Sequence, residues 1–211
     1  MASSCVDIHT HKRKGGAIEM LSLMADSEPL CEEAPCSLGI HPWHAGNRDV
    51  EAALERIATD PVQAIGEIGL DSCCPVDRSL QETLFRQQLV IAERRRLPVV
   101  LHTVRAFDRT MHILADYVLP GVIFHGFIGS AQQIGQGVRA GYFFSFGFRS
   151  LQSPRTVEAL RALPADRLFL ETDDAPEPVD RLYRKVSELL LCPEEQLRET
   201  IYENYLRLFG I

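Results

Sequence analysis

The stretch Cys5-Val6-Asp7-Ile8-His9-Thr10-His11 sets the pattern from which the fold is predicted. Its apolar residues suit a short β-strand, and alternate side chains of a strand share one face. Asp7, His9 and His11 are therefore expected to project together from the C-terminal end of the strand. Two histidines on one edge can bind a divalent ion, but an isolated His-x-His is explained equally well by two surface histidines. The rest of the chain decides between these interpretations.

Short apolar runs recur along the chain and alternate with helical patterns. The predicted strands span residues 4–8, 17–23, 36–40, 62–67, 98–102, 121–125, 142–146 and 167–171. The predicted helices span residues 49–58, 76–96, 106–117, 131–140, 154–163, 178–191 and 193–209. Such alternation implies parallel strands joined by crossover helices. We therefore expect an α/β fold that closes into a TIM-type (β/α) barrel, with an open doubly wound sheet as the alternative.

The start of this barrel is expected to be irregular. Residues 12–35 leave little room for full helices around the second strand, and their proline and glutamate clusters indicate loops. The sequence therefore predicts a distorted barrel that lacks one or two outer helices near the N-terminus.

Composition indicates an ordinary globular chain. Its 211 residues, of which 45% are hydrophobic and 24% charged, suit a single domain over 1–211. No apolar run approaches the roughly 20 residues that span a bilayer, and the N-terminus lacks a signal-peptide pattern, so we expect a cytoplasmic protein without membrane contact. The six cysteines form no Cys-x-x-Cys pair and are expected to stay free thiols. A net charge of −7 repels polyanions, so nucleic-acid binding would need a local basic surface or metal ions.

Six side chains that can bind metal follow the predicted strands at matching places. In a closed barrel the C-terminal strand ends form one mouth, where active sites are built. Four imidazoles and two carboxylates there have the composition of a dinuclear metal site, with one carboxylate between the ions and one near a bound water. The predicted metal ligands are His9, His11, Glu67, His102, His125 and Asp173.

As a set, the motifs of this chain resemble those of the TatD-related metal-dependent hydrolases, within the amidohydrolase-like superfamily. The matching stretches are Asp7 to His11, Gly39-Ile40-His41-Pro42, Gly66-Glu67-Ile68-Gly69-Leu70-Asp71, Leu97 to His102, Phe124 to Ser130, Leu170-Glu171-Thr172-Asp173, and Asn204 to Gly210. The resemblance implies a TIM-barrel-like fold, one to three divalent ions, and phosphodiester hydrolysis, with DNA as the substrate of several members. It also implies the ligand assignment in which one ion is held by His9, His11 and Asp173, Glu67 is the bridge, and a second ion is held by His102 and His125.

The implied catalytic residues are Asp173 and Glu67. A metal-activated water would attack phosphorus while Asp173 takes the proton. His41, His44 and Arg105 follow predicted strands and are candidates for binding a substrate phosphate, with loop structure as the equal alternative. The chain departs from the family pattern after His41-Pro42, because Trp43-His44 follows where many members have a histidine directly after the proline.

Three functional hypotheses remain open. The first is a divalent-metal-dependent phosphodiesterase, a deoxyribonuclease that acts on DNA. The second is a metal-dependent hydrolase of a small amide, lactone or phosphate ester, because the same centre serves all of these bonds. The third is a barrel that binds metal without catalysis. Two ions are expected; histidine ligands favour zinc, manganese or nickel, whereas magnesium would rely on the carboxylates. No obligate protein partner is evident.

Overall fold

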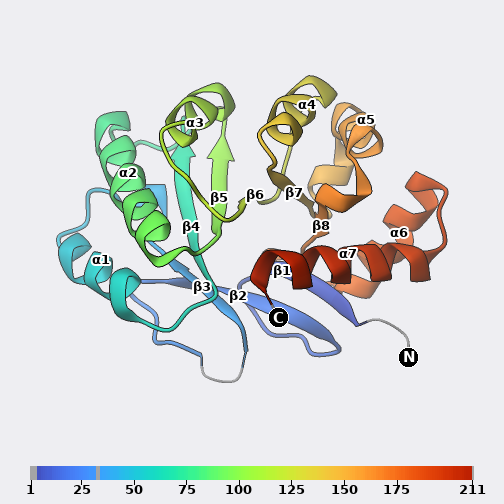
Figure 1. The fold of residues 1–211 in the computed structure, drawn as a ribbon, viewed down its shortest axis with the longest axis horizontal. Helices are drawn as coiled ribbons and strands as arrows, with labels where there is room; N and C mark the ends of the chain where they lie inside the picture. Colours follow the sequence, from blue (N-terminus) through green and yellow to red (C-terminus); the bar gives the residue numbers. More distant parts are fainter. Residues whose placement is uncertain (1–3, 32–33, 211) are drawn as a thin grey trace. The chain divides into compact units, whose positions relative to one another are not determined.

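A computed structural model describes residues 4–31 and 34–210 of the chain. Eight strands lie along these residues, with helices between the strands from β3 onward, and the sheet order follows the chain order (Figure 1). The pairs β1–β2, β3–β4, β4–β5 and β7–β8 are parallel. The strands are β1 (Cys5–Thr10), β2 (Ala17–Met24), β3 (Cys36–Gly39), β4 (Ala64–Asp71), β5 (Val99–Val104), β6 (Val122–Phe124), β7 (Phe143–Phe146) and β8 (Leu168–Leu170).

Seven α-helices and three short 3₁₀ helices accompany the strands in the described residues. The α-helices are α1 (Val50–Thr59), α2 (Arg78–Arg95), α3 (Phe107–Leu114), α4 (Ala131–Arg139), α5 (Pro154–Ala162), α6 (Val179–Leu190) and α7 (Glu194–Phe209). The 3₁₀ helices are η1 (Pro42–His44), η2 (Ser150–Gln152) and η3 (Ala165–Arg167).

Every predicted strand and helix is present, with shifted ends. In the described residues no helix separates β1 from β2 or β2 from β3, which confirms that outer helices are missing there. β4 and β5 continue beyond their predicted ends, to Asp71 and Val104. Glu67 and His102 therefore lie within strands rather than at their ends. The register of β4 against β5 shifts between Ile65 and Ile68, an irregularity that alternation alone does not predict.

The chain forms two compact units, and each is described by itself. One unit consists of the residues up to Leu21 together with those from Phe124 onward; the other is Ser22–Ile123. The prediction of one domain over 1–211 stays a prediction.

In the first unit, β1 lies between two parallel neighbours. β2 pairs with it from Cys5↔Ala17, and a parallel bridge joins Thr10 to Asp173, just after β8. Two helices fix these strands by side-chain hydrogen bonds. Tyr183 of α6 both accepts from the Val6 N–H and donates to the Val6 carbonyl, at 3.0 Å each. Asn204 of α7 donates to the carbonyls of Ala165 and Leu168, at 2.9 Å each, so this residue is structural.

In the second unit, α2 fixes two strand ends with two glutamines. Gln88 is fully buried; its Oε1 accepts from the Ile40 N–H at 2.7 Å and its Nε2 donates to the Ile40 carbonyl at 3.1 Å. Gln81 makes the same pair of bonds with the backbone of Asp71, at 2.8 and 3.1 Å. A spacing of seven residues places both amides on one face of the helix. Gln81 and Gln88 are polar in sequence, but in the structure they belong to the buried face of α2.

Three glycines let β3, β4 and β5 approach one another closely. A Cβ on Gly69 would overlap with the carbonyl oxygen of His102. A Cβ on Gly66 would lie 2.6 Å from the Cβ of Val100, and one on Gly39 would lie 2.7 Å from the Gly66 carbonyl carbon. Side chains are excluded at these positions by the neighbouring strand.

Among residues 4–31 and 34–210, none of the helices combines the length and the apolar character that a membrane crossing requires.

Candidate metal centre

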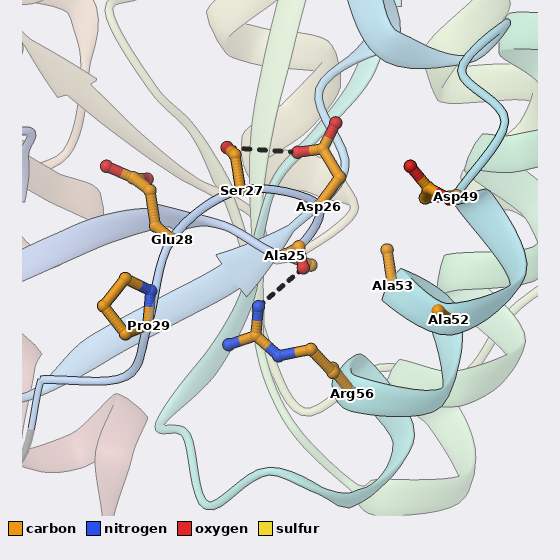
Figure 2. Close-up of a pocket in the computed structure, with 9 residues that line it drawn as sticks. All are labelled: Ala25, Asp26, Ser27, Glu28, Pro29, Asp49, Ala52, Ala53 and Arg56. Carbon is orange, nitrogen blue, oxygen red and sulfur yellow. Dashed lines mark hydrogen bonds between the residues drawn. The ribbon is translucent and has the colours of Figure 1, made fainter.

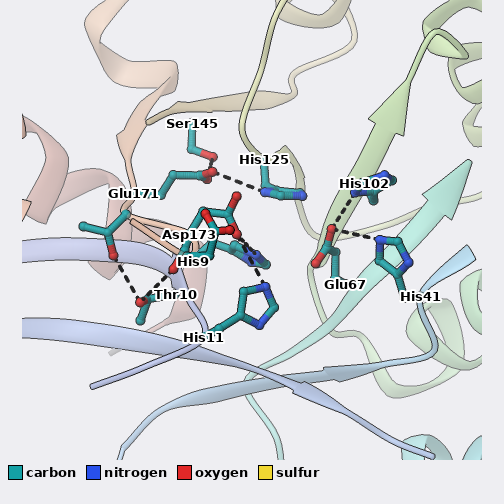
Figure 3. A network of polar contacts seen from close by, with 12 residues as sticks. His9, Thr10, His11, His41, Glu67, His102, His125, Ser145, Glu171 and Asp173 are labelled. Carbon is teal, nitrogen blue, oxygen red and sulfur yellow. Dashed lines mark hydrogen bonds and ion pairs between the residues drawn. The ribbon is translucent and has the colours of Figure 1, made fainter. Parts of the chain in front are cut away.

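The first unit brings together two predicted histidines and the predicted proton acceptor. His9 is fully buried in β1, His11 follows that strand, and Asp173 follows β8. Asp173 Oδ1 lies 3.9 Å from His9 Nε2 and 3.4 Å from His11 Nε2 (Figure 3). The ligand atoms of all three residues lie within 4.8 Å of one another. Two imidazoles and a carboxylate in this arrangement suit a divalent transition metal.

Backbone bonds hold Asp173 beside the two histidines. Its N–H donates to the His9 carbonyl at 2.9 Å, and its carbonyl accepts from the His11 N–H at 3.3 Å. Asp173 has a φ of 53°, in the left-handed region that few residues other than glycine adopt. The surrounding structure thus imposes an unusual backbone at the residue predicted to carry the chemistry.

Asp7 binds the residue that precedes Asp173. It is buried, and it accepts from the Thr172 N–H at 2.8 Å and from the Thr172 hydroxyl at 2.6 Å. Burial raises the pKa of Asp7 to about 7, although the bonds from Thr172 and the charge of Lys14 oppose this rise. The Lys14 ammonium donates to the hydroxyls of Thr172 and Thr10, at 2.5 and 3.1 Å. Asp7 therefore supports the residue that precedes Asp173.

His125 also lies in the first unit, directly after β6. Its ring centroid is 4.1 Å from that of His9, and its Nδ1 is 3.2 Å from Glu171 Oε1. Glu171 is fully buried and also accepts a hydrogen bond from the Ser145 hydroxyl. A carboxylate on one ring nitrogen fixes the orientation of an imidazole, as is common for histidines that bind metals. In the sequence Glu171 is recognisable only as part of a motif, because a buried strand end has no periodic signal.

The second unit holds a cluster of two histidines around Glu67. Glu67 Oε1 lies 2.6 Å from His102 Nδ1 and 3.4 Å from His41 Nε2 (Figure 3). The rings of His41 and His102 have centroids 4.3 Å apart, and the three ligand atoms lie within 4.8 Å of one another. His41 and Glu67 are both buried. His41, predicted as a substrate contact, is thus placed among the candidate metal ligands.

Asp71 and Trp43 border this cluster, and neither was predicted to belong to the site. Asp71 Oδ2 accepts from the indole N–H of Trp43 at 2.7 Å and lies 3.3 Å from His102 Nε2. Burial alone would raise the pKa of Asp71, but the bonds from Trp43, the Cys73 N–H and His102 outweigh it, and the pKa is lowered. Asp71 is therefore an ionised neighbour of His102.

The other two predicted substrate contacts are His44 and Arg105, both in the second unit, and the His44 ring centroid lies 6.4 Å from that of His41. His44 forms an ion pair with Asp26, at 2.8 Å. Asp26 lines a surface pocket of about 380 Å³ with Ala25, Glu28 and Arg56, shown in Figure 2. The polar groups there bond to one another or to backbone: Arg56 donates to the Ala25 carbonyl, and Glu28 accepts from the Met24 N–H. Arg105 is exposed directly after β5, with a φ of 49°.

The predicted ligands thus divide between the two units. His9, His11 and Asp173 come together in one unit, whereas Glu67 and His102 come together in the other with His41. In each cluster the donors are imidazole nitrogens and a carboxylate, so the residues fit a divalent ion. It stays a prediction that His125 and His102 bind the same ion and that Glu67 bridges the two ions.

Comparisons with known proteins match the chain to metal-dependent hydrolases and nucleases. A family model described as TatD related DNase matches residues 10–210. The uncharacterized metal-dependent hydrolase YjjV of Escherichia coli is 31% identical over 217 residues, which cover 91% of this chain and 81% of that protein. The 3'-5' ssDNA/RNA exonuclease TatD of a Rahnella strain is 37% identical over 162 residues, or 71% of this chain and 60% of that protein.

The crystal structure of the Escherichia coli YjjV protein shares the fold. It superposes with a TM-score of 0.86 at 24% identity, and all of both chains is covered. Together with the chain-order arrangement of parallel strands, this likeness confirms the predicted TIM-type barrel. The chain therefore belongs to the TatD-related DNase family of metal-dependent hydrolases.

Proposed function

We propose that the protein is a divalent-metal-dependent phosphodiesterase that hydrolyses DNA. The observation that carries this proposal is the pair of histidine–carboxylate clusters, His9–His11–Asp173 in one unit and His41–Glu67–His102 in the other. The name of the TatD relative, a 3'-5' ssDNA/RNA exonuclease, supports a nucleic-acid substrate. Two ions are part of the proposal, one for each cluster, with zinc, manganese, nickel or magnesium as candidates.

The proposed ligands of the first ion are His9, His11 and Asp173, and those of the second are Glu67 and His102. His125 and His41 would complete the donor set. A bound divalent ion lowers the pKa of water toward neutrality and stabilises negative charge on phosphoryl oxygens. The protein would then have to orient the metal ligands and accept the proton that the attacking water loses.

Asp173 is the proposed proton acceptor. Its side chain is 28% exposed, so it can reach a solvent-derived nucleophile, while its backbone is fixed by His9 and His11. Glu67 is almost completely buried between two imidazoles, which suits a ligand better than a group that exchanges protons with solvent. The two carboxylates would therefore have different roles.

A basic loop beside the first cluster supports an anionic substrate despite the net charge of −7. Residues Lys12, Arg13 and Lys14 directly follow His11. Buried Glu19 accepts from the backbone N–H groups of Lys14 and Gly15 at 2.8 and 2.9 Å, which anchors the loop. Lys12 is exposed, so its ammonium can contact a phosphate. This local surface is the kind that polyanion binding by an acidic protein requires.

A turnover assay on metal-defined protein tests the proposal. Mg²⁺, Mn²⁺ and Zn²⁺ are supplied separately, and the substrates are single-stranded DNA, a generic phosphodiester, and a panel of amides and lactones. DNA cleavage that falls at least about 100-fold in Asp173→Asn supports the proposed function, because a positioned general base contributes about that much or more. Asp174→Asn is the matched control, since Asp174 is exposed and pairs with Arg149 instead.

Two outcomes would contradict this assignment. Activity on a small ester, amide or lactone without activity on DNA would retain the metal centre and reject the nuclease. Near-normal DNA turnover in Asp173→Asn would reject the proposed base.

Cytoplasmic location and the absence of an obligate protein partner belong to the same proposal. The six cysteines are free thiols, which suits a reducing compartment. DNA, or a small phosphate ester in the second hypothesis, is the proposed partner.

A further inference from the structure

Trp43 is the single tryptophan of the chain, and it is unusually exposed. Its side chain lies in η1, directly after Pro42, and the residue is 57% exposed. A tryptophan normally contributes to stability by burying its large apolar surface. Trp43 leaves more than half of that surface in solvent, so packing alone does not explain its position.

The exposed ring is nevertheless held in one orientation. Its indole N–H donates to Asp71 Oδ2 at 2.7 Å, and its backbone N–H donates to His41 Nδ1 at 3.2 Å. Asp71 is itself fixed, because its Oδ1 accepts from the Cys73 N–H at 2.7 Å and its backbone is bound by Gln81. A buried carboxylate therefore anchors one edge of an exposed aromatic ring.

This ring borders the second metal-ligand cluster within the same unit. Its centroid lies 4.8 Å from that of His41 and 6.2 Å from that of His102, in edge-on arrangements with interplanar angles of 84° and 76°. Neither histidine ring is stacked parallel to the indole, and more than half of the surface of Trp43 stays exposed to solvent. A rigid aromatic face beside candidate metal ligands is suited to a flat group carried by the substrate.

We propose that Trp43 is a stacking platform for an unpaired nucleobase next to the phosphate that is cleaved. The inference rests on the proposed function and makes it more specific, because it assigns a residue of this chain to the base beside the cleaved phosphate. In a duplex each base is already stacked on its neighbours, whereas an unpaired base can leave its strand and stack on an aromatic side chain. Stacking tolerates every base, since each has a flat π-face.

Intrinsic fluorescence gives a direct test, because Trp43 is the only tryptophan that can respond. The protein, with its metal content as isolated, is titrated with a single-stranded oligothymidine whose phosphorothioate linkages resist hydrolysis. An abasic strand of the same length, linkage and charge is the comparison. We expect quenching by oligothymidine and little by the abasic strand. Equal quenching by both strands, or none by oligothymidine, would overturn the inference.

Substitutions measure the contribution of the ring to binding. Trp43→Ala should weaken binding of a labelled oligothymidine roughly 5- to 150-fold in an anisotropy titration, and Trp43→Phe should retain most of the affinity. Affinity for the abasic strand should stay nearly unchanged in both variants, which separates stacking from a general structural defect. Leu80→Ala is the matched control, since Leu80 is also an exposed apolar residue of this unit, at 47%. Equal losses for both strands in Trp43→Ala would contradict stacking.

The inference and the proposed function fail separately. Base-dependent quenching without hydrolysis in the turnover assay would reject the nuclease assignment and retain the stacking platform. Hydrolysis of single-stranded DNA without base-dependent quenching would reject the platform alone.

Discussion

Replacing Gln88 by Met should destabilise the protein strongly, although the site is uncharged and far from solvent. The Gln88 amide satisfies both the N–H and the carbonyl of Ile40, and both residues are fully buried. Methionine keeps the length and approximate volume of the side chain but can satisfy neither group. Each unsatisfied buried backbone group costs about 1–3 kcal/mol, so the expected loss for the two groups is about 2–6 kcal/mol.

The loss is large compared with the total stability of a domain, which is about 5–15 kcal/mol. It should appear as a lower free energy of unfolding in urea, followed by circular dichroism and tryptophan fluorescence together. A loss of about 3 kcal/mol corresponds to a fall in Tm of roughly 6–12 °C for a chain of this size. Coincident transitions from the two probes would justify a two-state treatment.

Gln87→Met is the matched control, because Gln87 is exposed on the same helix. This change should shift the free energy of unfolding by no more than about 0.5 kcal/mol. A decrease in the free energy of unfolding of less than about 1 kcal/mol in Gln88→Met, or no larger than that in Gln87→Met, would refute the reasoning. The two hydrogen bonds from Gln88 to the backbone of Ile40 would then not stabilise the fold as expected.

Three further predictions concern the ligands, the basic loop and a buried thiol. Glu67→Ala should lower the metal content found by elemental analysis after desalting, because a buried carboxylate between two imidazoles is lost; unchanged stoichiometry would contradict its role as a ligand. Lys12→Gln should reduce the slope of log affinity for single-stranded DNA against log salt by about 0.7, the value for one phosphate contact, while Arg94→Gln, an exposed cation on α2, should leave the slope unchanged. Burial raises the pKa of Cys5 from 9.0 to about 11, so the folded state keeps a proton that the unfolded state loses. Its contribution to stability is therefore present below pH 9 and is lost as the pH rises toward 11, and Cys5→Ala should flatten this part of the stability profile.

The sequence predicted the fold well because the fold depends on repeated local patterns. Each apolar run of a parallel strand is bounded by loop residues, and each helix has its own periodicity, so all eight strands and seven helices could be predicted with shifted ends. The strand ends were less accurate at β4, which was predicted over 62–67. In the structure Gly66 and Gly69 permit close strand contact, and β4 continues to Asp71.

The candidate site was predicted only as far as residue type and strand position determine it. The clustering of His9, His11 and Asp173 agrees with the expected arrangement within one unit. The approach of His41 to Glu67 was not foreseen, because it depends on the path of the chain after β3. The bond between Asp7 and Thr172 joins residues 165 positions apart, and no local pattern carries that information.

The glycines at the contact between β3, β4 and β5 have a consequence for how variation in this family should be interpreted. Gly66 immediately precedes a proposed metal ligand, and Gly69 lies against the carbonyl of another. Since neither position admits a side chain, both should be as intolerant of substitution as the ligands themselves, although neither donates an atom to a metal. A count of the positions that tolerate no substitution would therefore overstate the number of residues that bind metal or take part in catalysis. Alanine at Gly66 or Gly69 should be judged by the free energy of unfolding before it is judged by turnover.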